Sequence, residues 1–388
     1  MMKVTYGAKL VMVFMLFIMA ICTTTIAVAS YIDFDIWFTH EIVDEETSSP
    51  KKSATMKVTE TERITTSTSP TTTTTTTTIG MIGDVLLHHP LYFYTEYQTA
   101  FAPVQQAMQS VDFLLANQES MPAGQRFALS GYPKFNSPSH IIRDLQISGV
   151  DFMTIANNHT LDYGPQQAIT AIEHLQHYHM PYTGAFLSPE DKNTARIMQV
   201  NDISIAVLAY TYGTNQYKTA YPQGYEYIIS YLDEEQVIRD IEKLRAQVDV
   251  IVLSLHWGTE YSTVANAQQK QLATRFTHAG ADIIFGHHPH VLQSFEWVNG
   301  KPVYYSLGNF YSAQPWAGTN VGGIAKVEVS KTTRENKSTI TFPQAYFYPT
   351  TVVQTTNKQF IVQPLAQVGD RQGWHTSMVE QHLGLPSW

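Results

Sequence analysis

From residue 79 onward, two hydrophobic patterns alternate along the chain. Short apolar runs rich in β-branched residues are separated by longer stretches whose apolar positions recur every three or four residues. The first pattern predicts buried strands, and the second predicts amphipathic helices. The predicted strands are 79–83, 111–116, 151–156, 203–209, 249–255 and 281–286. The predicted helices are 102–110, 138–148, 165–179, 233–247 and 265–279. This alternation indicates an α/β fold around a largely buried sheet.

Two hairpins are expected beside this sheet. Their turns are predicted at Asn201-Asp202 and at Asn299-Gly300, because both pairs tolerate the backbone of tight turns. Beyond residue 330 the runs STITF and FIVQPL predict further short strands. The sequence therefore predicts a main domain over 79–330 and a β-rich C-terminal extension over 331–388.

The N-terminal region contains a segment long enough to cross a membrane. Leu10 to Ala29 carries no charge, and 20 residues at 1.5 Å each make about 30 Å of helix. Lysines precede this segment and aspartates follow it, which places the N-terminus in the cytoplasm and the remainder outside. Ala27-Val28-Ala29 also fits a signal-peptide cleavage site, in which case the protein is secreted. Residues 1–30 are thus an anchor or a signal peptide.

Residues 31–78 are expected to form an extracytoplasmic linker. The stretch 65–78 consists of threonine and serine with a single proline, including an unbroken threonine run from Thr71 to Thr78. Such a segment has too little apolar surface to offset the entropy of ordering it. The interpretation is an extended stalk that holds the domain away from the membrane.

Composition narrows the range of functions. With 24 Lys and Arg against 33 Asp and Glu, the net charge is −9, which disfavours a nucleic-acid partner. The single cysteine, Cys22, excludes an intramolecular disulfide and any cluster of thiolate metal ligands. Any metal site must therefore use oxygen and imidazole ligands.

Polar side chains follow five of the predicted strands. Because ligands bind at the carboxyl edge of open α/β sheets, these residues are expected to share one site. They are Asp84, Asn117 and Glu119, the run Asn157, Asn158 and His159, then His256, and finally His287, His288 and His290.

These groups suit a divalent metal centre of zinc, manganese or iron. Two metals about 3.5–4 Å apart share a bridging oxygen ligand, which Glu119 can supply. His159 can pass a proton to a leaving group. A turn, a helix cap or a packed histidine would explain each residue singly, but not all five strand ends together.

Six motifs carry a resemblance to a known family. They are GDVLLH (83–88), ANQES (116–120), ANNHTLDYG (156–164), HWGTEY (256–261), GADIIFGHHPHVLQ (280–293) and YSLGNF (305–310). In this order they resemble the CapA/PgsA family of bacterial capsule and poly-γ-glutamate synthesis proteins, over about 79–330. The resemblance implies a four-layer α/β sandwich similar to calcineurin-like metallophosphoesterases, preceded here by the N-terminal transmembrane segment.

The resemblance also implies roles for individual residues. Asp84, Asn158 and His256 match metal ligands, Glu119 matches the bridging carboxylate, and His159 matches the proton donor. Asp162, within the same motif as His159, is a further candidate.

The comparison with the calcineurin-like metallophosphoesterases implies two more histidine ligands and also shows one difference. His288 and His290 match the Gly-His-x-His element, with His287 in place of its glycine. The histidine usually found two residues after the first aspartate is absent, since Leu86 stands there, and His88 is a candidate substitute. The missing histidine weakens the expectation of one of the two metals, and with it the expectation of phosphatase activity.

Three functions remain open. One is a metal-dependent hydrolase or transferase that acts on an anionic polymer outside the cell. Another is a non-catalytic subunit that assembles with other polyglutamate synthase or export proteins. The third is a generic metallophosphoesterase.

Overall fold

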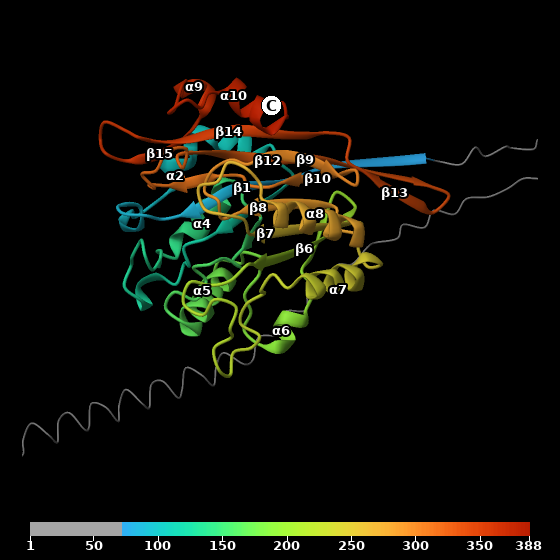
Figure 1. Ribbon diagram of the computed structural model, residues 1–388, viewed down its shortest axis with the longest axis horizontal. Helices are drawn as coiled ribbons and strands as arrows, with labels where there is room; N and C mark the ends of the chain where they lie inside the picture. The colour runs from blue at the N-terminus through green and yellow to red at the C-terminus, as the bar shows by residue number, and fades with distance from the viewer. Residues whose placement is uncertain (1–71) are drawn as a thin grey trace, which may run out of the picture. The chain divides into compact units, whose positions relative to one another are not determined.

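The computed structural model describes residues 72–388, which form two β-sheets with helices on their outer faces (Figure 1). The nine-stranded sheet has the order β15-β14-β12-β1-β2-β3-β4, with β11 paired to β1 and β13 paired to β12. The six-stranded sheet has the order β5-β6-β7-β8-β10-β9. The neighbours β1 to β4 run parallel, as do β6, β7, β8 and β10.

The elements have the following bounds. The strands are β1 (Thr72–Leu86), β2 (Phe113–Gln118), β3 (Phe152–Thr154), β4 (Tyr182–Thr183), β5 (Ile197–Val200), β6 (Ile203–Thr211), β7 (Val250–His256), β8 (Ile283–His287), β9 (Phe295–Val298), β10 (Lys301–Tyr304), β11 (Asn309–Ser312), β12 (Val321–Arg334), β13 (Lys337–Thr341), β14 (Ala345–Gln354) and β15 (Phe360–Pro364). The α-helices are α2 (Gln98–Phe101), α3 (Gln105–Gln109), α4 (His140–Ser148), α5 (Pro165–His177), α6 (Pro189–Asn193), α7 (Glu234–Arg245), α8 (Ala267–Ala279), α9 (Leu365–Val368) and α10 (Thr376–Leu383). Short 3-10 turns occupy Leu91–Phe93, Ala102–Val104 and Gly124–Arg126.

Three hydrophobic cores separate four layers. The middle core lies between the sheets, where Met81 of β1 and Phe113 of β2 share a cluster with Val252 of β7. A second core packs α4 and α5 against the outer face of the nine-stranded sheet. A third packs α7 and α8 against the outer face of the six-stranded sheet. The sequence-based expectation of a layered α/β sandwich therefore agrees with the structure.

The six predicted strands and five predicted helices are all present, although the 102–110 segment is a 3-10 turn followed by the short α3. Both hairpins are confirmed, since Val200 pairs with Ile203 around the first turn and Val298 pairs with Lys301 around the second. Periodicity identified these elements because each buries one continuous apolar face or stripe.

The predicted linker is wrong at its C-terminal end. Thr72 to Thr78 form the first half of β1 and pair with β12, from Thr72 opposite Arg334 to Thr78 opposite Glu328. Threonine is β-branched and favours strands, and β12 supplies the hydrogen-bonding partner that a stalk would lack. The other residues of the predicted linker, 31–71, and the predicted membrane segment lie outside the described residues.

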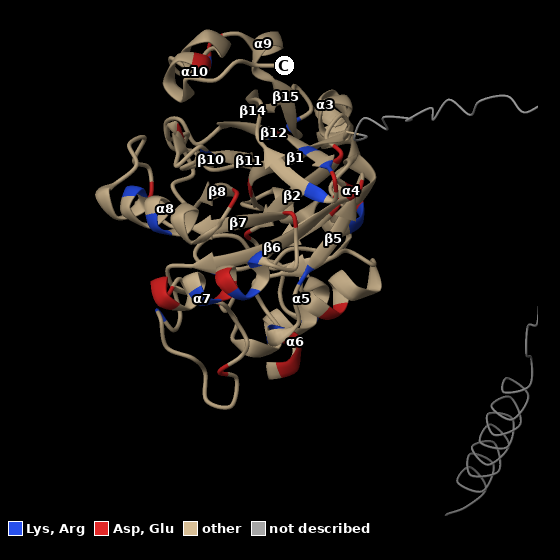
Figure 2. Cartoon of the chain, turned by 90° about the vertical axis from the view of Figure 1, so that its right-hand side faces the viewer, with Lys and Arg blue, Asp and Glu red and all other residues tan. Residues whose placement is uncertain are grey.

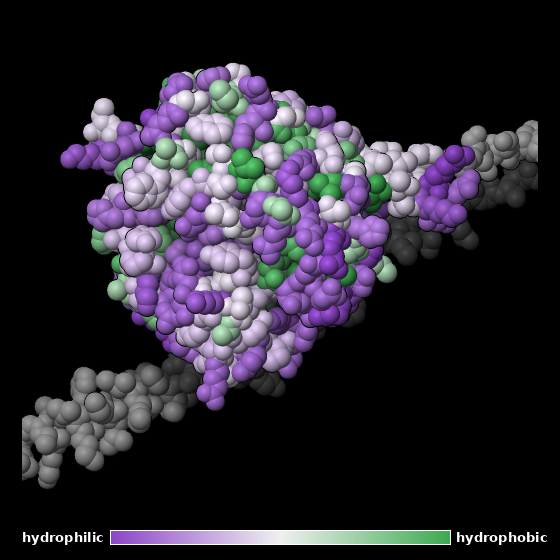
Figure 3. Space-filling model, in the orientation of Figure 1, coloured by the Kyte–Doolittle hydropathy of each residue, from purple (hydrophilic) through white to green (hydrophobic). Residues whose placement is uncertain are grey.

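The C-terminal residues complete the nine-stranded sheet. The predicted boundary at 330/331 falls inside β12, and β13, β14 and β15 extend the same sheet. Within residues 72–388, no helix has the length and apolarity needed to span a membrane. The face in Figure 3 is largely hydrophilic, with hydrophobic residues in small scattered groups.

Two glycines allow the backbone to close tightly around the carboxyl edge of the sheets. A Cβ on Gly83 would lie 2.3 Å from the Gly308 carbonyl oxygen, and one on Gly286 would lie 2.0 Å from the Tyr305 carbonyl oxygen. Only glycine fits such approaches. They fix the position of Asp84 and His287, the residues that directly follow.

Candidate metal centre

The two sheets bring carboxylates and imidazoles to one shared edge. Asp84 lies near the end of β1 and Glu119 directly follows β2, both in the nine-stranded sheet. His256 ends β7 and His287 ends β8, both in the six-stranded sheet. Parallel strands present their carboxyl ends on the same side, which explains why residues distant in sequence converge here.

Glu119 stands at the centre of this group without a hydrogen bond. Its side chain is fully buried, and within residues 72–388 neither carboxylate oxygen has a hydrogen-bond partner. The Nε2 atoms of His256 and His290 each lie 3.6 Å from the same oxygen, Oε1. Burial raises the pKa of Glu119 well above its usual range. A buried, unpaired carboxylate is costly, so this geometry calls for a cation between the imidazoles.

Asp84 is held by hydrogen bonds on both oxygens. Oδ1 accepts from Asn117 Nδ2 at 2.9 Å and from His287 Nδ1 at 2.8 Å. Oδ2 accepts from the His288 backbone N–H at 3.3 Å and lies 3.1 Å from His290 Nδ1. Burial alone would raise its pKa, but the hydrogen bonds from His287 and His290 hold the pKa of Asp84 well below its usual range. Asp84 is therefore ionised, and its hydrogen bonds fix the orientation of its carboxylate.

The surroundings of His290 determine which of its nitrogens can bind a metal. Nδ1 lies between two acceptors, Asp84 Oδ2 and Asn309 Oδ1, the latter at 3.0 Å. Asn309 donates its own Nδ2 to Gln314 and to the Thr319 carbonyl, so its oxygen faces the imidazole. Nδ1 consequently carries the proton, and Nε2 is directed at Glu119. Burial opposes protonation of His290, but Glu119 and Asp84 raise its pKa to about 9. Without a metal the ring therefore carries a second proton on Nε2, and a metal bound at Nε2 would displace it.

His256 and Asn158 face each other on the other side of Glu119. His256 Nε2 and Asn158 Oδ1 are 2.9 Å apart, and His256 Nδ1 has no partner within the described chain. Two donor atoms about 2.1 Å from one ion stand roughly 3 Å apart, so this pair has the spacing of two ligands. Burial, followed by the neighbouring His288, lowers the pKa of His256 well below its usual range. A neutral imidazole is the form that binds metal.

A second group of donors lies next to the first. Ligand atoms of Glu260, His288 and His290 all lie within 4.8 Å of one another, as do those of Asp84, Glu119 and His290. Burial and the neighbouring His290 lower the pKa of His288 to about 3, so its ring is neutral. Glu260 was not predicted, although it lies inside the HWGTEY motif.

His159 lies beside the donors and is oriented by Asp162. Its Nδ1 is 2.7 Å from Asp162 Oδ2, which also accepts the Phe135 backbone N–H at 2.7 Å. The Phe135 ring packs edge-on against His159, with the ring centroids 4.5 Å apart. With Nδ1 bound to Asp162, the proton that His159 can exchange is the one on Nε2.

Two predicted histidines have other contacts. His88 Nδ1 lies 3.1 Å from Ser312 Oγ and 3.3 Å from the Leu86 carbonyl, and His88 belongs to neither donor group within residues 72–388. His287 contacts Asp84 through Nδ1 and the Met81 sulfur through Nε2, at 3.3 Å. Both nitrogens of His287 are thereby engaged, and it acts as a support for Asp84.

The residues present fit a divalent metal centre. Asp84, Glu119, Asn158, His256, His288 and His290 could hold the metal, and Glu260 adds a donor. Asn117 and Asn309 orient these ligands. Asn309 was also not predicted, but the YSLGNF motif that contains it was a signal. Tyr212 had no signal in the sequence; its ring centroid lies 4.6 Å from that of His288.

Comparison with known proteins agrees with the sequence motifs. A family model described as bacterial capsule synthesis protein PGA_cap matches residues 78–314. "PGA biosynthesis protein CapA" of Bacillus subtilis is 29% identical over 260 residues, 64% of this chain and 67% of that protein. "Capsule biosynthesis protein CapA" of Bacillus anthracis is 27% identical over 257 residues, 63% of this chain and 62% of that protein. The matched region thus spans about two thirds of each relative.

Solved structures include more distant neighbours. The calcineurin-like phosphoesterase YfkN from Bacillus subtilis aligns with 80% of this chain and 96% of its own, with 14% identity and a TM-score of 0.46.

Proposed function

Since the chain belongs to the bacterial capsule synthesis protein family PGA_cap, we propose that it acts in the biosynthesis or export of an anionic capsule polymer such as poly-γ-glutamate. We further propose that it carries a metal-dependent hydrolase or transferase site for that polymer or for its attachment bond. The names of the two Bacillus relatives support the biological process.

The environment of Glu119 is the observation that most strongly supports a metal site. A fully buried carboxyl without a hydrogen bond, placed 3.6 Å from two imidazole nitrogens, is ionised only when positive charge accompanies it, and a divalent ion held by these three groups would supply that charge. Two divalent ions such as manganese, zinc or iron would polarise a substrate oxygen and lower the pKa of bound water. Asp84 and His290 would hold one side of this centre, and Asn158 and His256 the other.

His159 supplies the group that moves a proton. Asp162 fixes its ring and binds Nδ1, so Nε2 is the atom that donates to a leaving oxygen or nitrogen. Its side chain is nearly buried, and Phe135 packs against its ring. The arrangement excludes bulk water from one side of the imidazole and holds its orientation.

We place the domain on the outer surface of the cell membrane. The uncharged segment from Leu10 to Ala29, with lysines before it and aspartates after it, supports a single N-terminal anchor. Other synthase or export subunits at the membrane and the polymer itself would be its partners.

The test is the metal content of the full chain, purified in detergent and reconstituted with manganese or zinc. We expect about two ions per chain. Glu119→Gln should lose at least one of them, because an amide cannot bridge two cations. Glu296→Gln, a change in an exposed ion pair with Lys270, is the control and should keep both. A stoichiometry near zero in the unmodified protein would refute the metal site.

A non-catalytic assembly role remains the second candidate. The observation in its favour is Leu86, a buried residue at the position where the resemblance to calcineurin-like metallophosphoesterases implies a histidine ligand. A His159→Asn variant separates the two roles in cells. Loss of polymer with normal protein levels supports catalysis, whereas unchanged polymer production supports assembly.

A further inference from the structure

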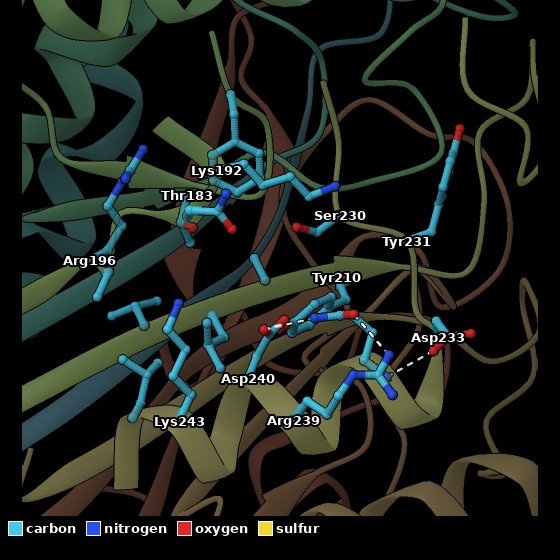
Figure 4. Close-up of a pocket in the computed structure, with 18 of the residues that line it drawn as sticks. Thr183, Lys192, Arg196, Tyr210, Ser230, Tyr231, Asp233, Arg239, Asp240 and Lys243 are labelled. Atoms are coloured by element: carbon cyan, nitrogen blue, oxygen red, sulfur yellow. Dashed lines mark hydrogen bonds between the residues drawn. The ribbon is translucent and has the colours of Figure 1, made fainter. Parts of the chain in front are cut away.

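A large pocket lies apart from the candidate metal centre (Figure 4). Its volume is about 1000 Å³, and its walls are formed by β6, α7 and the segments around 192–196 and 230–233. None of the candidate metal or proton-transfer residues lines it. It is therefore a separate feature with its own chemistry.

The pocket is richer in cations than the chain as a whole. Its lining contains four basic side chains and two acidic ones, although the protein has a net charge of −9. The basic residues are Lys192, Arg196, Arg239 and Lys243, and the acidic residues are Asp233 and Asp240. In Figure 4, Lys192 reaches in from one wall and the α7 residues Arg239 and Lys243 from the other.

Two of these cations are available to a ligand. Arg196 is already committed to Asp191 at 2.5 Å and to backbone carbonyls. By contrast, Arg239 donates only to Gln236, and Lys243 has no side-chain partner within residues 72–388. Both are exposed on α7, the helix on which Figure 2 shows both acidic and basic residues. Asp240 accepts hydrogen bonds from Tyr210 and Gln236 and forms no ion pair with Arg239 or Lys243 within residues 72–388.

The backbone of β6 presents an unpaired peptide group to the same pocket. The pairing of β5 with β6 ends at Ala206. On that edge the Val207 N–H donates to the Arg196 carbonyl, and the Thr211 N–H donates to the Ser230 carbonyl, each at 3.0 Å. Ala209 lies midway between them, so its N–H and C=O point the same way because strand polar groups alternate.

Ser204 and Tyr212 form backbone hydrogen bonds on the β7 side of β6, so Ala209, an odd number of residues from both, faces the other edge. No hydrogen bond within the described chain reaches its peptide group there, although the residue is only 3% exposed. Buried backbone groups are nearly always paired, and an exception indicates a missing partner. An extended chain that adds to a strand edge supplies both a carbonyl and an N–H.

We infer that this pocket binds an extended chain that carries both amides and carboxylates. The amides pair with Ala209 on the edge of β6, while the carboxylates contact Arg239 and Lys243 on α7. The choice of a glutamate polymer as the natural occupant rests on the proposed function. The pocket would then hold the polymer at a distance from the metal centre, as a site of capture rather than of reaction.

The test uses the full chain and a fluorescent oligo-γ-glutamate, with binding followed by anisotropy in the presence of chelator. The double variant Arg239→Glu/Lys243→Glu should weaken binding by roughly tenfold or more, because two attractive charges become repulsive. Lys337→Glu/Lys358→Glu has the same net charge, but both residues are exposed and lie outside the pocket. This control should bind like the unmodified protein. Equal weakening in both variants would mean non-specific charge attraction and would overturn the inference.

Two further measurements separate this inference from the proposed function. A polyacrylate of equal length has carboxylates without amides and should bind more weakly; equal affinity would overturn the pairing with Ala209. Replacing the chelator with manganese should leave the effect of the α7 double variant unchanged. If binding required manganese and the α7 double variant bound like the unmodified protein, the polymer would bind at the metal centre, which refutes the pocket and leaves the proposed function intact.

Discussion

Asp162 is the positioning residue for His159 in the proposed proton transfer, because the two side chains are in contact. Asp162 accepts from Nδ1 and thereby leaves the exchangeable proton on Nε2. An asparagine at this position can donate to Nδ1 and stabilise the opposite tautomer.

We therefore expect Asp162→Asn to lower the hydrolysis rate by about 10²- to 10⁴-fold while metal content stays normal. The rate is measured as loss of poly-γ-glutamate chain length and as cleavage of bis(p-nitrophenyl) phosphate. Tyr163→Phe, which removes only a hydroxyl contact with Ser130, is the neighbouring control. A variant that cleaves as fast as the unmodified protein would remove Asp162 from the mechanism.

His88 makes the stability of the folded chain sensitive to acid. Burial lowers its pKa from 6.5 to about 4. At pH 5 the unfolded chain binds a proton at this position and the folded chain does not, so the free energy of unfolding falls as the pH drops from 6.5 toward 4. His88→Gln should reduce the loss of stability between pH 7 and pH 5 by up to about 2 kcal/mol.

Urea unfolding at the two pH values measures this difference. His89→Gln alters the adjacent, exposed histidine and should leave the pH dependence as it is in the unmodified protein. Identical behaviour of the two variants would mean that the folded chain does protonate His88 at pH 5.

At the scale of elements, the first half of β1 is held by Asp112 as well as by β12. Asp112 Oδ2 accepts from the Thr78 N–H and from Thr78 Oγ1, each at 2.8 Å. Removing residues up to Thr78 deletes these bonds and exposes the edge of β12 that pairs with this half of β1.

A chain that begins at Ile79 should therefore be less stable than one that begins at Thr72, by about 1–3 kcal/mol. Chemical denaturation measures the difference. A chain that begins at Thr76 keeps the Asp112 contacts and should lose less. If all three chains unfold at the same denaturant concentration, Thr72 to Thr78 contribute no stability.

The same strand shows what the sequence could and could not predict. The elements with an apolar stripe or run were predictable, because burial imposes a period of 3.6 or 2. Thr72 to Thr78 have no such pattern, and their pairing depends on β12, more than 240 residues away. Local composition cannot contain that information.

The residues of the candidate site likewise include some that the sequence predicted and some that it could not. Strand-end position predicted the cluster around Glu119, because parallel strands share one edge. Glu260 and Asn309 lie in loop and edge positions that only the folded chain places near His290. The missing partner of Ala209 depends on where β5 ends, which no local pattern encodes.

At the scale of the whole molecule, the metal centre should act as a clamp between the two sheets. Asp84 and Glu119 come from the nine-stranded sheet, while His256, His288 and His290 come from the six-stranded sheet. A ligand that binds only the folded state stabilises it by about 2.7 kcal/mol at a hundred times its dissociation constant. Without the ion, burial raises the pKa of Glu119 and favours its protonated form, so the sheets lose the link through this carboxylate.

Chelation should consequently lower the melting temperature of the full chain, by about 2–4 °C or more for a domain of this size. The same treatment should have a smaller effect on Glu119→Gln, because an amide at this position removes the bridging ligand and the variant should already lack at least one ion. Differential scanning calorimetry with and without EDTA measures both shifts. Equal shifts in the two proteins would place the stabilising ion elsewhere, and no shift in either would mean that the sheets are held together by their shared hydrophobic core alone.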